Sequence, residues 1–281
     1  MSWQRLVRIA QHRVIDADVP ARAAQMSFYF FLSVFPALLI LTATLDLFFD
    51  AQWLVRDTVL ERLALVAPAA IVQALARVMD NVGSVPGAPL TSGILIALWA
   101  ASSGRVATIR GLNRAYAIEE ERPWWRRRLV GLALTLVLMT LTMLAMLLIA
   151  HGVPLAGALA QHLGFGPTFV LIWQIAQWPA IFCFVLLAFS VLYHFAPHRP
   201  HGRWQWVRPG TLLAIALWLV ASLGLKFYVA NFGAYNVTYG SLGTVIVVQL
   251  WFFFTSVAIL VGAEINAEFE STMTHFATKR Q

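Results

Sequence analysis

Separated blocks of about 20 apolar residues constrain this chain more than any other feature. A helix of that length crosses a hydrocarbon core about 30 Å thick. The blocks fall at about residues 26–49, 90–109, 129–150, 168–195, 210–229 and 243–263. Hydrophobic residues make up 60% of the chain and charged residues 12%, against roughly 45–50% and about 25% in soluble domains. The sequence therefore predicts an all-α polytopic membrane protein with six transmembrane helices in a single integral membrane domain.

The distribution of lysine and arginine predicts the orientation of these helices. Basic residues are in excess in the cytoplasmic flanks of membrane spans. If the N-terminus is inside, fifteen Lys and Arg residues lie in inner segments and three in outer ones, namely Arg56, Arg62 and Arg77. Both termini are therefore predicted to be cytoplasmic. The net charge of +7 comes mainly from these flanks, so it does not indicate a nucleic-acid partner.

The stretch from Asp50 to Pro89 is the only long segment outside the predicted spans. Its apolar residues recur at steps of three and four and are interrupted at Pro68, which indicates two amphipathic helices. We expect a helical hairpin on the outer face, between the first and second spans. It would lie on lipid or pack on the bundle.

Charged side chains within the spans are the first candidates for a functional site, because a charge near the bilayer centre costs at least a few kcal/mol. Depth counted along the spans pairs Arg105 with Glu264 near the inner face. The same count pairs Asp46 with Lys226 near the outer face. The alternative is that each side chain reaches water from within a turn of the interface. An Arg105–Glu264 pair would be either a working polar site or a structural clasp.

The start of the third span carries a cluster of aromatic and basic residues. Trp124 and Trp125 precede Arg126, Arg127 and Arg128. Such a cluster is typical of an anchor at the membrane interface, and it can also recognise anionic lipid head groups. Both interpretations make membrane lipids the partner.

Residues for enzymatic chemistry are not evident. His194, His198 and His201 have a spacing that could hold a metal, but Pro197 and Pro200 interrupt the helix that would align them. One cysteine allows no intrachain disulfide. There is no phosphate-binding loop and no nucleophile elbow. We therefore expect no catalytic site, no metal and no cofactor.

Several motifs in fixed order resemble one family. They include "AAQMSFYFFLSVFPALL", "WAASSGRVATIRGLNRAYAIEEERPWWRRRL" and "LWFFFTSVAILVGAEINAEFE". Over about residues 21–270 the chain resembles the YihY/BrkB family of bacterial inner-membrane proteins, whose old ribonuclease label this sequence does not support. The resemblance implies six helices in the inner membrane and no established reaction. It implies that these positions matter: Ser33, Pro36, Arg105, Asn113, Tyr116, Asn236, Tyr239, Gly240, Glu264 and Asn266.

Two functions remain open from the sequence. The first is transport of an amphiphilic or lipid-like envelope substrate along a polar path bounded by the first, second, fifth and sixth spans. Arg105 and Glu264 would then lie at its inner end, and the loop holding Asn236 and Tyr239 at its outer mouth. The second is a scaffold or assembly factor that moves nothing and uses the outer hairpin as its partner surface. A homo-oligomer is compatible with either.

Overall fold

The protein is built from long helices. The computed structural model describes residues 18–48, 60–61, 64, 69, 72–73, 76–77, 90–165, 167–198, 208–232 and 241–278. Within this part of the chain there is no strand, so the prediction of an all-α protein is confirmed. The helices are α2 (Val19–Phe48), α5 (Leu90–Ala115), α6 (Trp124–Leu163), α7 (Pro167–Phe195), α8 (Pro209–Phe232) and α10 (Ser241–Thr278).

Four of these helices contain a segment long and apolar enough to cross a membrane. The segments are Trp124–Ile149, Thr168–Phe195, Pro209–Asn231 and Val245–Ser271. They correspond to the third, fourth, fifth and sixth predicted spans. The first two predicted spans correspond to α2 and α5, which did not meet this criterion over the described residues. Membrane crossing by α2 and α5 therefore stays a prediction.

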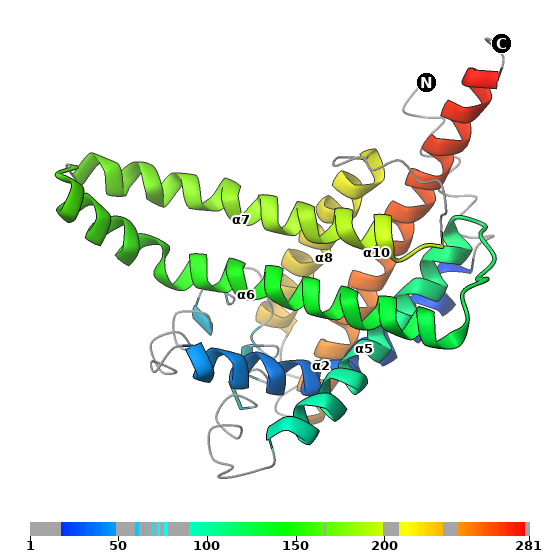
Figure 1. The fold of residues 1–281 in the computed structure, drawn as a ribbon, viewed down its shortest axis with the longest axis horizontal. Helices are drawn as coiled ribbons and strands as arrows, with labels where there is room; N and C mark the ends of the chain where they lie inside the picture. Colours follow the sequence, from blue (N-terminus) through cyan, green and yellow to red (C-terminus); the bar gives the residue numbers. More distant parts are fainter. Residues whose placement is uncertain are drawn as a thin grey trace.

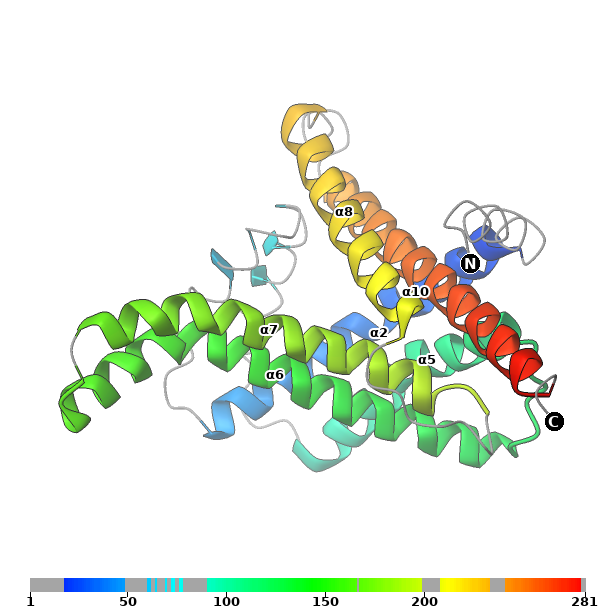
Figure 2. The ribbon, with the colours of Figure 1, turned by 90° about the horizontal axis from the view of Figure 1, so that it is seen from above.

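The helices meet at one end of the bundle and separate toward the other. Helix α2 packs on α5 and α10, α8 packs on α10, and α6 packs on α7 and α5. The α6–α7 pair and the α8–α10 pair diverge away from the contact between α7 and α8 (Figure 2). The start of α2, the ends of α5 and α10 and the loop from α5 to α6 lie toward the same side, on the right in Figures 1 and 2. We call this side the junction end. It corresponds to the predicted cytoplasmic face.

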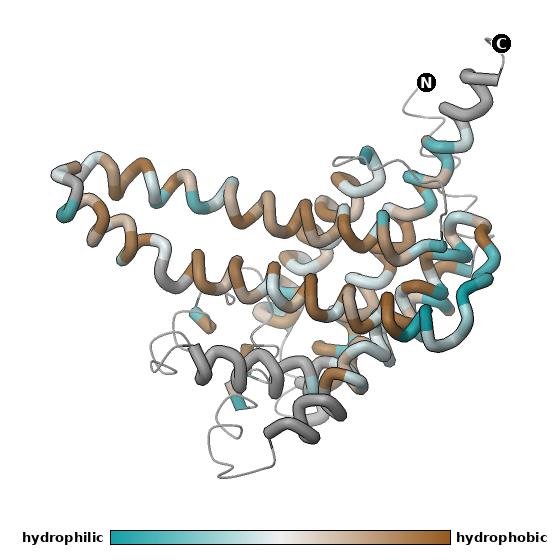
Figure 3. Tube along the Cα trace, in the orientation of Figure 1, coloured by the Kyte–Doolittle hydropathy of each residue, from teal (hydrophilic) through white to brown (hydrophobic). Residues whose placement is uncertain are grey.

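Hydropathy separates the junction end from the rest of the bundle. Figure 3 shows mainly hydrophobic residues along α6 and α7, and hydrophilic residues in the loop that joins α5 to α6. Large apolar side chains on the outward faces of these helices, such as Leu136 and Ile175, are exposed. Such a surface fits contact with lipid. The fully buried side chains Met26, Ile109 and Tyr193 lie in a core nearer the junction end.

Helices α6 and α10 extend furthest beyond their predicted spans. Helix α6 continues past Pro154 to Leu163 and ends where Gly164 takes a left-handed conformation, with φ 71°. A residue in that conformation is a common end of a helix, so the cap rather than the apolar block sets the boundary. Helix α10 continues to Thr278, so Glu264 does not end it. The predicted outer hairpin lies almost entirely outside the described residues.

Candidate functional site

Arg105 lies where α5 closely approaches α2. A Cβ atom on the neighbouring Gly104 would come within 2.7 Å of the Ser33 hydroxyl and 2.9 Å of the Phe30 ring. The Cζ atom of Arg105 lies 5.6 Å from the centroid of that ring. The Nε of Arg105 is buried and has no hydrogen-bond partner. The guanidinium is therefore held against an aromatic face without a polar partner among the described residues.

The structure does not bring Arg105 and Glu264 together. No described carboxylate acts on the charge of Arg105. Glu264 is 4% exposed, and its charge acts instead on Arg22 of α2, beside Arg114 of α5. The predicted second span ended at Ile109, but α5 continues to Ala115. Arg105 is therefore about 15 Å from the end of its helix, deeper than the count along the sequence suggested.

Asn266 joins α10 to the start of α8. Its Oδ1 accepts a hydrogen bond from the backbone N–H of Gly210, 2.9 Å away, and its Nδ2 is buried without a partner. The first N–H groups of a helix have no partner within the helix, so Asn266 satisfies one of them. A Cβ atom on Gly210 would lie 2.1 Å from the carbonyl oxygen of Gly262. This part of the predicted site holds two helices in close contact.

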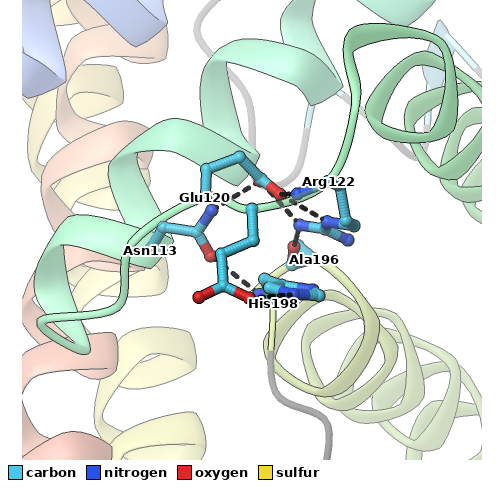
Figure 4. A network of polar contacts seen from close by, with 6 residues as sticks. Asn113, Glu120, Arg122, Ala196 and His198 are labelled. Atoms are coloured by element: carbon cyan, nitrogen blue, oxygen red, sulfur yellow. Dashed lines mark hydrogen bonds and ion pairs between the residues drawn. The ribbon is translucent and has the colours of Figure 1, made fainter.

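Asn113 belongs to a network that ties together three segments at the junction end (Figure 4). Its Nδ2 donates to Glu120 Oε2 at 2.7 Å, and its Oδ1 accepts from the backbone N–H of His198 at 2.8 Å. The guanidinium of Arg122 donates twice to Glu120, at 2.7 and 2.8 Å, and once to the carbonyl of Ala196 at 2.8 Å. The network thus joins the end of α5, the loop after it and the end of α7.

The network also changes the acidity of Glu120. Burial alone would raise the pKa of its carboxyl, but the Arg122 guanidinium and the Asn113 amide outweigh this, and the pKa is lowered. A carboxyl whose pKa is lower in the folded state stabilises the fold at pH values above its unfolded-state pKa. That stabilisation is lost as the pH falls through the lowered folded-state value. At neutral pH the network is therefore a stabilising structural element.

The aromatic and basic cluster at the start of α6 divides into two parts. Trp124 and Trp125 are exposed, and Arg126 lies over the Trp125 ring with its Cζ 5.2 Å from the centroid. These residues agree with the predicted interfacial anchor. Arg128 instead turns toward α5, where its Cζ lies 4.0 Å from the Trp99 ring centroid and its Nη2 donates to the Trp99 carbonyl. Arg128 therefore joins two helices.

The different positions of Arg126 and Arg128 lead to different expected effects of mutation. Arg128→Gln should lower the free energy of unfolding by about 1–2 kcal/mol, because it removes a charge-assisted hydrogen bond and a cation–π contact. Arg126→Gln should change it by less than about 0.5 kcal/mol, since its contact is exposed. Thermal unfolding of the purified variants in detergent, followed by tryptophan fluorescence, measures both. Equal effects would contradict the helix-joining role of Arg128.

Only some of the other predicted site residues lie in the part of the chain that the structure describes. Tyr116, just after α5, packs against the core and acts electrostatically on Tyr193. The Nζ of Lys226 donates to the carbonyl of Ala64 at 2.6 Å. The Asp46 side chain lies outside the described residues, so the predicted Asp46–Lys226 pair stays a prediction. Asn236 and Tyr239 also lie outside them.

Sequence reasoning missed several residues that organise the junction end. The Arg208 guanidinium forms an ion pair with Glu270, and Arg22 accompanies Glu264. The Tyr193 hydroxyl donates to the carbonyl of Ile259 at 2.8 Å. The position of Arg208 beside a helix start could be predicted from the sequence, because Pro209 follows it directly and proline is common at the first position of a helix. The larger acidic influence on Arg22 is Asp18, four residues earlier, and only the effect of Glu264 has no local signal in the sequence.

Comparison with known proteins gives consistent matches. A family model described as Virulence factor BrkB matches residues 10–281. The putative ribonuclease-like protein YfkH of Bacillus subtilis (strain 168) is 33% identical over 250 residues, which cover 88% of this chain and 88% of that protein. A UPF0761 membrane protein of Tolumonas auensis is 35% identical over 77 residues, or 27% of this chain and 25% of that protein. Another, of Verminephrobacter eiseniae, is 25% identical over 171 residues, or 60% and 39%. No solved structure matches the chain.

Proposed function

Since this chain belongs to the virulence factor BrkB family of membrane proteins, we propose that it transports an amphiphilic, lipid-like substrate across the bacterial inner membrane. Arg105 would take part in the substrate site. The junction end would be the cytoplasmic end of the path, and both termini would be cytoplasmic.

The observation that carries the proposal is the isolation of Arg105. Ionisable residues inside membrane segments are costly, and they usually pair with one another or serve a substrate path. At the junction end several charges form ion pairs, as Arg122 does with Glu120 and Arg208 with Glu270. Arg105 has no such partner among the described residues. A charge kept only for stability would be expected to have a partner, so Arg105 favours a role in binding.

The arrangement of the helices offers a second support. The α6–α7 and α8–α10 pairs contact each other near the junction end and diverge beyond it (Figure 2). Pairs that are joined at one end can change their separation at the other by a small rotation about the contact. Pro36 in α2 and Pro179 in α7 lie inside their helices and permit bending. Transporters commonly move by such rigid-body rotation.

The proposal is tested by reconstituting the purified full chain into vesicles that carry a trace of acyl-chain-labelled fluorescent lipid. Chemical quenching from outside measures how fast labelled lipid moves between the leaflets. We expect movement faster than in protein-free vesicles, with or without an imposed proton gradient. If no lipid moves faster in either condition, the transporter is contradicted and the scaffold is favoured.

We further propose that the chain is not a nuclease, although the printed name of its Bacillus subtilis relative is ribonuclease-like. Among the described residues no three His, Cys, Asp or Glu side chains are grouped as a metal site would require. The same purified preparation should therefore leave single-stranded and structured RNA intact in the presence of Mg²⁺ or Mn²⁺. Cleavage that persists through purification would contradict this.

A further inference from the structure

We propose that Arg105 binds the anionic head group of a lipid, and that this head group carries a phosphate without a compensating amine. This rests on the proposed function, since it names the substrate class of the same site. Three features of the surroundings of Arg105 carry it: the geometry of the aromatic contact, the absence of nearby acidic groups among the described residues, and the apolar neighbours.

The N–H groups of Arg105 have an aromatic contact but no hydrogen-bond partner among the described residues. The Phe30 ring lies against the guanidinium, with its centroid 5.6 Å from Cζ. A guanidinium that contacts a ring with its face still presents its N–H groups in the plane. No hydrogen bond joins those groups to another described residue, and Nε is buried without a partner. Part of the Arg105 side chain is accessible. A planar fork of donors in this state suits the oxygen atoms of a phosphate, which can accept two hydrogen bonds from it.

The charges of the described residues around Arg105 indicate that the ligand is anionic and has no positive group. Three carboxylates at the junction end act on other cations: Glu120 and Glu270 form ion pairs with Arg122 and Arg208, and the charge of Glu264 acts on Arg22. None of these carboxylates acts on Arg105. A zwitterionic head group would bring an ammonium group to a place where no described carboxylate can accept it. An anionic head group neutralises Arg105 and leaves no second charge to be satisfied.

The neighbours of Arg105 favour a lipid over a water-soluble anion. Phe30 packs edge-to-face on Phe252 of α10, with ring centroids 6.1 Å apart, so α2 and α10 present an aromatic pair beside the guanidinium. Val106 and Ala107 on α5 are buried in the same region. Because these side chains are buried in the protein, a free phosphate entering this region would lose its hydration without finding other polar partners among the described residues. A lipid needs to bring only its head group to Arg105, since its acyl chains stay in the bilayer.

The test compares three labelled lipids in vesicles that contain the full chain. They carry the same labelled acyl chain and differ in head group: phosphatidylglycerol is anionic, phosphatidylcholine is zwitterionic, and a glucosyl-diacylglycerol is neutral. For the unmodified chain we expect phosphatidylglycerol to move about tenfold faster than the other two, the factor expected from one charge-assisted hydrogen-bonding interaction. Equal rates for all three lipids would overturn the inference while leaving the proposed function intact. If no lipid moves, the proposed function fails instead.

Variants assign the preference to Arg105. Arg105→Gln should reduce the preference for phosphatidylglycerol to less than about twofold, and Arg105→Lys should retain part of it because a lysine keeps the charge without the planar fork. Arg110→Gln is the matched control, since Arg110 is an exposed arginine on the same helix. It should retain the full preference. If Arg105→Gln keeps the preference, or Arg110→Gln loses it equally, the assignment to Arg105 is wrong.

Two additional measurements complete the design. Native mass spectrometry of the detergent-solubilised chain compares retention of phosphatidylglycerol with that of phosphatidylcholine, so that binding is tested without requiring transport or a variant. We expect preferential retention of phosphatidylglycerol, and equal retention would count against the inference. Glycerol 3-phosphate added to the vesicles tests the source of the anion. Little inhibition at millimolar concentration is expected for a lipid site, and strong inhibition that depends on Arg105 would show a site for soluble phosphates instead.

Discussion

Replacing Gly210 by alanine should strongly destabilise the protein, and the same change at Gly224 should not. A methyl group on Gly210 would lie 2.1 Å from the carbonyl oxygen of Gly262 and 2.6 Å from Asn266 Oδ1. The carbonyl belongs to the backbone of α10, so the overlap is relieved only if α8 moves away from α10. Such a shift also breaks the hydrogen bond from Gly210 to Asn266. We expect a loss of about 3 kcal/mol or more in the free energy of unfolding.

Gly224 is a suitable control because it lies in the same helix with open space around its Cβ position. Alanine favours the helical conformation over glycine by about 0.5–1 kcal/mol, so Gly224→Ala should be neutral or slightly stabilising. Thermal unfolding in detergent, combined with gel filtration of the solubilised variants, distinguishes the two outcomes. If Gly210→Ala were as stable as Gly224→Ala, α8 and α10 could not cross as closely as the structure shows.

The close crossing of α8 and α10 shows why parts of this fold were predictable and others were not. A membrane helix is recognised from the length of its apolar block, and each predicted span lies within a helix to within one residue. The approach of Gly210 to Gly262 depends on the angle and position at which two distant segments cross. Small residues at membrane helix contacts are common, but a glycine in the sequence does not say which helix it meets.

The helix boundaries were predicted incorrectly for a different reason. Hydropathy reports where side chains face lipid, whereas a helix ends where its backbone groups find other partners. Residues after Ala150 are less uniformly apolar, yet α6 continues to Leu163 because Gly164 supplies the first left-handed cap. Helix α10 likewise extends beyond its apolar block. In both helices the predicted boundary reported the lipid-facing segment rather than the helix.

The candidate site residues stay predictions, and the sequence did not predict the contacts that the described ones make. Arg105, Asn113, Glu264 and Asn266 were all singled out, and each is in a polar or buried setting. Depth along a sequence measures only one coordinate, so it could not tell that Glu264 lies near Arg22. The lack of a described polar partner for Arg105 could not be predicted for the same reason, because it depends on where the neighbouring helices lie.

The second large effect is expected from Asn113→Asp. Aspartate has the shape of asparagine and still accepts the hydrogen bond from the His198 backbone N–H. It loses the donor that faces Glu120 Oε2 at 2.7 Å and places a second negative charge there (Figure 4). Two carboxylates at that distance cannot both remain ionised without cost. We expect a loss of about 2–3 kcal/mol in the free energy of unfolding at neutral pH.

The pH dependence and a second substitution separate charge repulsion from other causes. As the pH falls, one carboxyl of the pair takes up a proton and becomes a donor, so the deficit of Asn113→Asp should shrink. Adding Glu120→Gln restores a donor opposite the introduced carboxylate. The double variant should therefore be more stable than the sum of the single effects by at least about 1 kcal/mol. Additive effects would mean that the two side chains do not interact.

The same variants also distinguish structural from functional polar groups. The Asn113 network holds the junction end together, while Arg105 lies about 12 Å further along α5. Asn113→Asp should therefore lower the unfolding temperature without changing the ratio of anionic to zwitterionic lipid movement in vesicles held well below that temperature. Arg105→Gln should show the reverse pattern, since it removes only the contact with the Phe30 ring and no ion pair or hydrogen bond to a described residue. A head-group preference that changed with Asn113→Asp would mean that the junction end takes part in selecting the substrate.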